Sequence, residues 1–141
     1  MEVEWLILAD AAQVAGGKLN MLGGGWDVLT VNDEWPHKQQ VAIAVAFTVP
    51  WNETNQAHAV YIAIIAEEGQ SEILRVDAQL EVGRPVGILQ GQAQRAQVAI
   101  EGIIELQAGM YDVVTGVQNG GEKHISFRVV PGPNLGNQPR L

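Results

Sequence analysis

Hydrophobic and polar residues alternate along most of the chain with the period of two that is typical of β-strands. The clearest example is the segment 41–49, where large side chains occupy the odd positions and small ones the even positions. The odd positions hold Val41, Ile43, Val45, Phe47 and Val49, and the even positions hold Ala42, Ala44, Ala46 and Thr48. Because the large residues are β-branched or aromatic, this pattern predicts a strand rather than a helix. The small apolar face predicts close coverage by another layer, from the same domain or from a neighbouring subunit.

Two pairs of further strands are predicted to form β-hairpins. Residues 111–118 and 123–130 alternate on either side of a turn that begins with Asn119-Gly120, a pair that can adopt the positive φ of a tight turn. Residues 57–66 and 71–82 flank a short polar turn in the same way. Both hairpins are antiparallel because their turns are too short for a crossover connection.

The first part of the chain is less regular. Residues 5–14 are apolar and rich in alanine, so a short helix over residues 8–13 competes with a strand. Gly16-Gly17 predicts a turn, and Gly23-Gly24-Gly25 breaks or bulges the chain before the apolar segment 26–31. The pattern leaves the choice between helix and strand at residues 5–14 open.

Residues 95–106 predict another strand, in which Ile103 and the neighbouring Gly102 are compatible with a bulge. About eight to nine short strands are then expected, with no long helix. We predict an all-β, single-domain antiparallel β-sandwich over residues 1–130, of immunoglobulin-like or jelly-roll type. Residues 131–141 contain three prolines and two glycines, and we expect this C-terminal tail to dock on a partner or a neighbouring subunit.

The composition fits one domain with an unusually small number of charges. The chain has 141 residues, of which 47% are hydrophobic and 17% charged, against about 25% charged in typical soluble domains. This composition excludes intrinsic disorder. The deficit is concentrated between residues 39 and 66, where Glu53 is the only charged side chain. A strand pair this poor in charge lies either in the centre of the sandwich or against another molecule.

The formal net charge is −8, which opposes binding to nucleic acid, so we expect no nucleic-acid partner. The N-terminus is acidic, and no apolar run approaches the 18 residues of a membrane span. We therefore expect no membrane insertion and a cytoplasmic location, or a place in a virus particle assembled in the cytoplasm. The absence of cysteine excludes disulfides, thiolate zinc sites and a cysteine nucleophile.

Several segments contain residues that catalytic or cofactor-binding motifs use, but their spacing does not match those motifs. Gly23-Gly24-Gly25 lacks the Gly-Lys-Ser/Thr ending of a phosphate loop and the third glycine of a dinucleotide-binding loop. Ser71 and Ser126 do not sit in a Gly-x-Ser-x-Gly sequence, and the three histidines show no metal-ligand spacing. We expect no catalytic residue, no metal and no cofactor. A histidine or carboxylate site assembled across the sheets is the enzymatic alternative.

The loop at residues 50–58 is the most distinctive segment. Trp51 can anchor a partner or stack on a ligand. Asn52, Asn55 and His58 can form hydrogen bonds with polar groups of that partner or ligand. These four residues are the candidates for partner or ligand binding. The alternative is that the same side chains only stabilise an irregular loop between two strands, since asparagine and threonine bond nearby backbone groups.

Several short motifs are spread over nearly the whole chain. They are Leu8-Ala9-Asp10, Gly17-Lys18, Gly23-Gly24-Gly25-Trp26, Pro50-Trp51-Asn52-x-Thr54-Asn55-x-x-His58, Gly83-Arg84-Pro85 and Gly109-x-Tyr111. Together they resemble a family of short uncharacterised bacterial proteins of unknown function, and the tryptophan-asparagine segment is the most specific of them. The resemblance supports a single β domain and implies no catalytic residue.

The leading functional hypothesis is a non-enzymatic structural or interaction protein. Such a protein acts through protein–protein contacts in a homo-oligomer or a larger assembly, for example as a virus-particle or phage decoration subunit. The hypothesis rests on the low charge, the alanine face at residues 41–49 and the tail. The alternative is a β-sandwich module that binds a small ligand or a carbohydrate, with Trp51 as its stacking platform.

Overall fold

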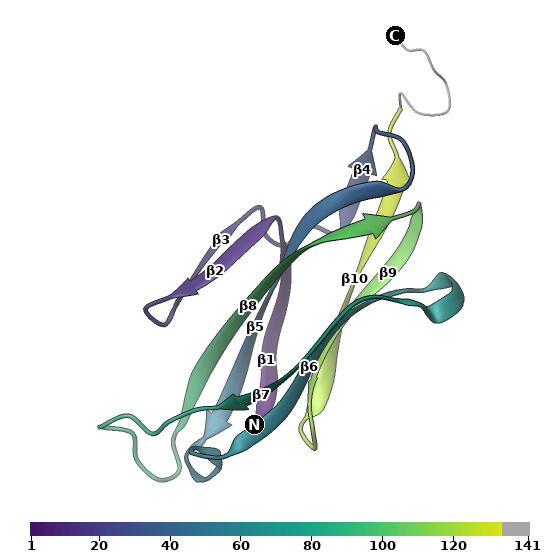
Figure 1. Cartoon of the computed structure of the whole chain (residues 1–141). Helices are drawn as coiled ribbons and strands as arrows, with labels where there is room; N and C mark the ends of the chain where they lie inside the picture. Colours follow the sequence, from purple (N-terminus) through teal and green to yellow (C-terminus); the bar gives the residue numbers. More distant parts are fainter. Residues whose placement is uncertain (134–141) are drawn as a thin grey trace.

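The computed structural model describes residues 1–133, and it confirms an all-β fold (Figure 1). The described residues form ten strands, one more than the upper end of the expected range, and no α-helix. The strands are β1 (Glu2–Ala9), β2 (Ala11–Ala15), β3 (Lys18–Leu22), β4 (Val28–Val31), β5 (His37–Pro50), β6 (Ala57–Ala66), β7 (Glu72–Glu81), β8 (Ala93–Leu106), β9 (Gly109–Val117) and β10 (Gly121–Pro131). Two short 3-10 turns, η1 (Trp51–Glu53) and η2 (Glu68–Gln70), follow β5 and β6.

Two sheets pack face to face as a β-sandwich. One sheet has three strands in the order β1-β5-β8, and the other has five strands in the order β4-β10-β9-β6-β7. Both predicted hairpins are present, as β6-β7 and β9-β10. One pairing departs from the antiparallel expectation, because Val28–Val31 lies parallel to Arg128–Pro131. Strands β2 and β3 form a separate hairpin beside the three-stranded sheet (Figure 1).

The core lies between the two sheets and follows the predicted alternation. The five large side chains at odd positions from Val41 to Val49 are no more than 1% exposed. Phe127 of β10 is equally buried, with Tyr111 stacked on its ring at 5.1 Å between centroids and Trp26 edge-on at 5.4 Å. Apolar burial on this scale is the main source of stability for a domain of this size.

The alternative of a helix near the N-terminus is wrong. Residues 5–14 form the end of β1 and most of β2, with a bend at Asp10 between them. Leu6 and Leu8 pair with Val45 and Ile43 of β5, so the strand is held by a partner more than thirty residues away. Alanine has a high helix propensity, but packing against a distant strand overrides this weak local preference.

The bulge expected near Ile103 is also wrong. β8 pairs with β5 without a shift of register over its whole length, and Ile103 simply faces outward. The bulge of this sheet lies in β1, between Val3 and Trp5. Because side chains alternate strictly in an unbroken strand, two adjacent isoleucines must occupy opposite faces, and Ile104 is the buried one.

The alanine face of β5 is covered from within the same chain. Ala42 and Ala44 are fully buried, and the β2-β3 hairpin packs on them through Ala12, Leu19 and Met21. Small side chains allow this close approach of a third layer. Of the two alternatives that the sequence left open, the structure therefore has the covering layer inside the domain.

The tail expected to dock on a partner falls almost entirely outside the described part of the chain. Residues 134–141 are not described, so their docking stays a prediction. In the part that the structure describes, no helix is long and apolar enough to cross a membrane.

Candidate functional site

The loop that carries Trp51 begins directly after Pro50, where β5 ends and η1 turns the chain. The guanidinium of Arg84 lies over the Trp51 ring, 3.7 Å from its centroid. The same group donates from Nε to Thr54 Oγ1 at 2.9 Å and from Nη2 to the Trp51 carbonyl at 3.1 Å. Thr54 is 2% exposed and donates to the Trp51 carbonyl at 2.7 Å. Arg84 therefore ties two loops together and covers one face of the indole.

The other three candidates also make contacts within the loop. The carbonyl of Asn52 accepts a bond of 2.9 Å from Gln56, and a ring nitrogen of His58 lies 2.8 Å from the Glu53 carbonyl. Asn55 has φ +60°, and its backbone N–H donates to Val82 at 2.8 Å. Asn52 and Asn55 make these bonds through their backbone groups, and only His58 uses its side chain, so the loop-stabilising and the binding interpretations of the asparagines both stay predictions.

Only two of the four predicted binding residues line the same hollow. Trp51 and Asn52 line a hollow of about 320 Å³ with Gln90 and Gln92 of the loop before β8. Asn55 and His58 are not among its lining residues. Ligand binding by the four residues stays a prediction. Gln90 and Gln92 are additional polar groups at this hollow. The sequence did not single them out, because they lie in the loop after β7, far along the chain from the loop after β5.

Replacing Arg84 by alanine is expected to lower the free energy of unfolding by about 1–2 kcal/mol, since it removes one cation–π contact and two hydrogen bonds. Urea unfolding followed by circular dichroism measures the change. Arg84→Lys is the matched variant, because it keeps the charge over the ring but cannot donate from both guanidinium positions. A lysine variant as unstable as the alanine variant would show that the bonds, and not the charge, hold the loop.

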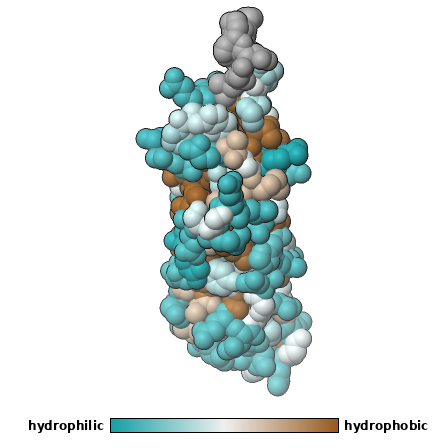
Figure 2. Space-filling model, turned by 90° about the vertical axis from the view of Figure 1, so that its right-hand side faces the viewer, coloured by the Kyte–Doolittle hydropathy of each residue, from teal (hydrophilic) through white to brown (hydrophobic). Residues whose placement is uncertain are grey.

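A second cluster of polar side chains lies on the outer face of the five-stranded sheet. The Tyr61 hydroxyl donates to Glu122, whose other oxygen lies 3.0 Å from a ring nitrogen of His124. Ser126 donates to Asp112 at 2.7 Å. Figure 2 views the molecule from the side on which β9 and β10 lie, and hydrophilic residues cover most of it, with the hydrophobic ones in separate patches.

This cluster depends on a glycine in the middle of a strand. Tyr61 and Glu122 lie on either side of Gly116, in the register β6-β9-β10. A Cβ at Gly116 would lie 2.7 Å from the Tyr61 ring, so only glycine leaves the ring room to cross β9. The hydrogen bond to Glu122 raises the pKa of Tyr61 to about 12, with burial as a smaller cause, and the same bond lowers the pKa of Glu122.

The Tyr61 hydroxyl is expected to titrate near pH 12 in the folded protein, about two units above an ordinary tyrosine. Since its folded pKa is raised, the contribution of the bond to stability is complete from neutral pH up to about pH 10 and is lost as the pH rises through 12. It is also lost in acid, where Glu122 becomes protonated, because the same bond lowers the pKa of Glu122. Ultraviolet absorbance of tyrosinate measures the titration, and Tyr61→Phe identifies the step. Glu122→Gln should return the pKa towards its ordinary value; an unchanged pKa in that variant would assign the shift to burial.

The geometry of the cluster gives its serine no activating base of the usual kind. Ser126 is bonded to Asp112 and not to His124, whose Nδ1 lies 4.0 Å from the same carboxylate. A histidine base must accept the hydroxyl proton of the nucleophile directly. The sequence did not single out this cluster, which depends on the register of β9 and β10 that places Ser126 opposite Asp112.

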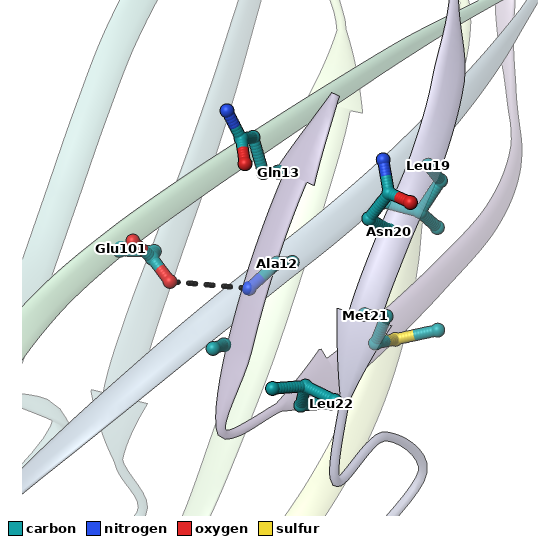
Figure 3. A pocket seen from close by; sticks show the side chains of 8 residues that line it. Ala12, Gln13, Leu19, Asn20, Met21, Leu22 and Glu101 are labelled. Carbon is teal, nitrogen blue, oxygen red and sulfur yellow. Dashed lines mark hydrogen bonds between the residues drawn. The ribbon is translucent and has the colours of Figure 1, made fainter. Parts of the chain in front are cut away.

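A third feature is the groove beside the β2-β3 hairpin (Figure 3). It has a volume of about 680 Å³ and is lined by both strands of the hairpin and by Glu101 of β8. The Glu101 carboxylate accepts a bond of 3.1 Å from the backbone N–H of Ala12, and Gln97 of β8 donates to the Gly17 carbonyl at 3.0 Å. These two hydrogen bonds hold the hairpin against β8. The groove therefore lies where the hairpin layer contacts the three-stranded sheet.

The fourth feature is the side of the sandwich along β7 and β8, where each sheet ends in an edge strand. Val98 and Ile100 of β8 face the core but are only partly buried, and so are Val76 and Leu80 of β7. Ile103, on the outer face of β8, is 70% exposed. Apolar side chains along an open edge are typical of a surface that another chain covers.

Comparison with known proteins gives a family and no activity. A family model described as a family of unknown function (DUF6941) matches residues 4–130. No curated protein matches the chain.

Proposed function

Since the chain belongs to this family of unknown function, which assigns no activity, we propose its function from the structure alone: a non-enzymatic protein that acts through protein–protein contacts in a homo-oligomer. The open edge of the sandwich along β7 and β8 carries this proposal. Its half-buried core side chains and exposed Ile103 form the apolar edge that a second chain would bury.

The positions of the titratable groups support a role without catalysis. The three histidines have different neighbours: His37 lies beside Gln39 and Asp33, His58 beside the Glu53 carbonyl, and His124 beside Glu122 and Asp112. Next to His124, the Ser126 hydroxyl donates to Asp112 and not to the histidine. Catalysis by acid and base needs such groups to converge on one reacting atom. Within residues 1–133, no three histidine, aspartate or glutamate side chains are grouped so that they could hold a metal ion.

Sedimentation velocity on the wild-type protein over a range of concentrations tests the proposal. We expect species heavier than the 15.2 kDa monomer, with a proportion that rises with concentration. A single 15.2 kDa species up to the highest attainable concentration would contradict a homo-oligomer. The cytoplasm, or a particle assembled there, remains the proposed place of action.

A further inference from the structure

β8 is a long edge strand with only part of the usual protection against pairing: it carries Arg95, Glu101 and Glu105, and the β2-β3 hairpin is bonded to its outer face. It has 14 residues, and in the described part of the chain it pairs with β5 on one side only. Natural edge strands are usually kept from pairing by bulges, prolines, charges or short length. β8 has neither a proline nor a shift of register, and its central stretch Ala96–Ile100 is uncharged.

The other edges are protected in ways that β8 is not. β1 contains the bulge between Val3 and Trp5, and β4 has only four residues. β7 carries four charged residues in ten, and Arg75 is fixed across its surface by bonds to Asp77 and Glu72. Since these devices resist pairing, β8 is the edge best suited to accept another strand.

The core side of β8 is incompletely covered. Val98 and Ile100 are partly exposed, although Val45 and Ile43, their partners on β5, are fully buried. The difference arises because β5 has a strand on both sides and β8 on one side only. A strand added at this edge would bury the remaining apolar surface of both side chains.

We propose that β8 pairs antiparallel with β8 of a second copy, about a two-fold axis at Val98, so that the two three-stranded sheets join into one. The proposal rests on the proposed function and names the surface and the partner. In this register Arg95 lies opposite Glu101 of the second copy, twice by symmetry, and Ala96 lies opposite Ile100 in the same way. Opposite charges therefore meet on the outer face, and small and large apolar side chains meet on the core face.

Both charged groups keep atoms for this second contact. Arg95 donates to Glu4 from Nε and Nη2, and among the described residues its Nη1 has no bond. Glu101 accepts from Ala12 through Oε2, and within residues 1–133 its Oε1 is unbonded. The Arg95 side chain is 56% exposed, and Glu101 is exposed. The bonds within each copy can thus persist when the two copies meet.

Two charge-reversal variants test the pairing. Arg95→Glu and Glu101→Arg each replace two opposite-charge pairs by two like-charge pairs, and each is expected to raise the dimer dissociation constant on the order of tenfold or more. An equimolar mixture of the two variants restores both opposite-charge pairs, so it should form a heterodimer about as stable as the wild-type dimer. Sedimentation velocity measures all three samples, and circular dichroism checks that each variant is folded.

Two matched variants separate the interface from effects within one copy. Glu4→Gln removes the partner of Arg95 inside the monomer and should leave the dimer unchanged. Glu105→Arg reverses a charge on the same face of β8, but residue 105 lies opposite Gly91, beyond the end of the paired strand, so it should also have no effect. Amides of β8 should in addition exchange more slowly at high protein concentration.

The outcomes are distinct. Dissociation of both single variants with recovery in the mixture supports the pairing of β8 at this register. Association that none of the variants changes overturns the pairing but leaves the proposed function standing, and so does dissociation by Glu105→Arg without dissociation by Glu101→Arg. A monomeric wild type overturns both. If Arg95→Glu fails to fold, a Glu101→Arg variant that still associates like the wild type overturns the pairing.

Discussion

Phe127→Ala is expected to lower the free energy of unfolding by about 3–5 kcal/mol, the largest effect of any substitution considered for this protein. The Phe127 ring is 1% exposed and lies between Tyr111 and Trp26, with centroid distances of 5.1 and 5.4 Å. Its removal reduces the buried apolar area, leaves a cavity between the sheets and eliminates the aromatic contacts with Tyr111 and Trp26. A loss of this size is a large fraction of the 5–15 kcal/mol that stabilises typical domains.

Urea unfolding measures this loss. Arg128→Ala is the control, because Arg128 is the next residue of the same strand and faces outward. We expect its effect to stay within about 0.5 kcal/mol. If both variants were equally unstable, the strand itself and not the aromatic cluster would account for the loss. A Phe127→Leu variant should recover part of the stability, since leucine refills part of the cavity.

Ala44→Leu is expected to destabilise the protein by about 1–3 kcal/mol through overpacking. Ala44 is fully buried beneath the β2-β3 hairpin, and a longer side chain there pushes Ala12, Leu19 or Met21 away from the sheet. The strain is local to the hairpin. We therefore expect faster amide exchange over residues 11–22, in addition to a lower midpoint in urea.

Gln40→Leu is the matched control for this experiment. It places the same side chain on the same face of β5, but Gln40 is exposed and lies outside the cover of the hairpin. Its effect on the free energy of unfolding should stay within about 0.5 kcal/mol. If Ala44→Leu were as harmless as Gln40→Leu, the hairpin would not be a packed layer of the domain.

The candidate site could be predicted from the sequence only in part. The bonds from Thr54 to Trp51 and from Gln56 to Asn52 link residues three and four positions apart, so the residue types of the loop are enough to suggest them. Arg84 lies thirty-three positions from Trp51, and nothing in the sequence indicates that it covers the ring. The same holds for Tyr61 and Glu122, which meet only because β9 brings β6 and β10 together.

The strands and hairpins were determined by the sequence, because alternation and turn residues act over a few neighbouring positions. The odd residues of 41–49 are buried as predicted, and Asn119 has the positive φ, +64°, expected of its turn. The tertiary structure alone decided which layer covers the alanine face, whether residues 5–14 form a strand, and that β8 lies at an open edge. These features depend on pairing between distant segments, where packing outweighs local preference.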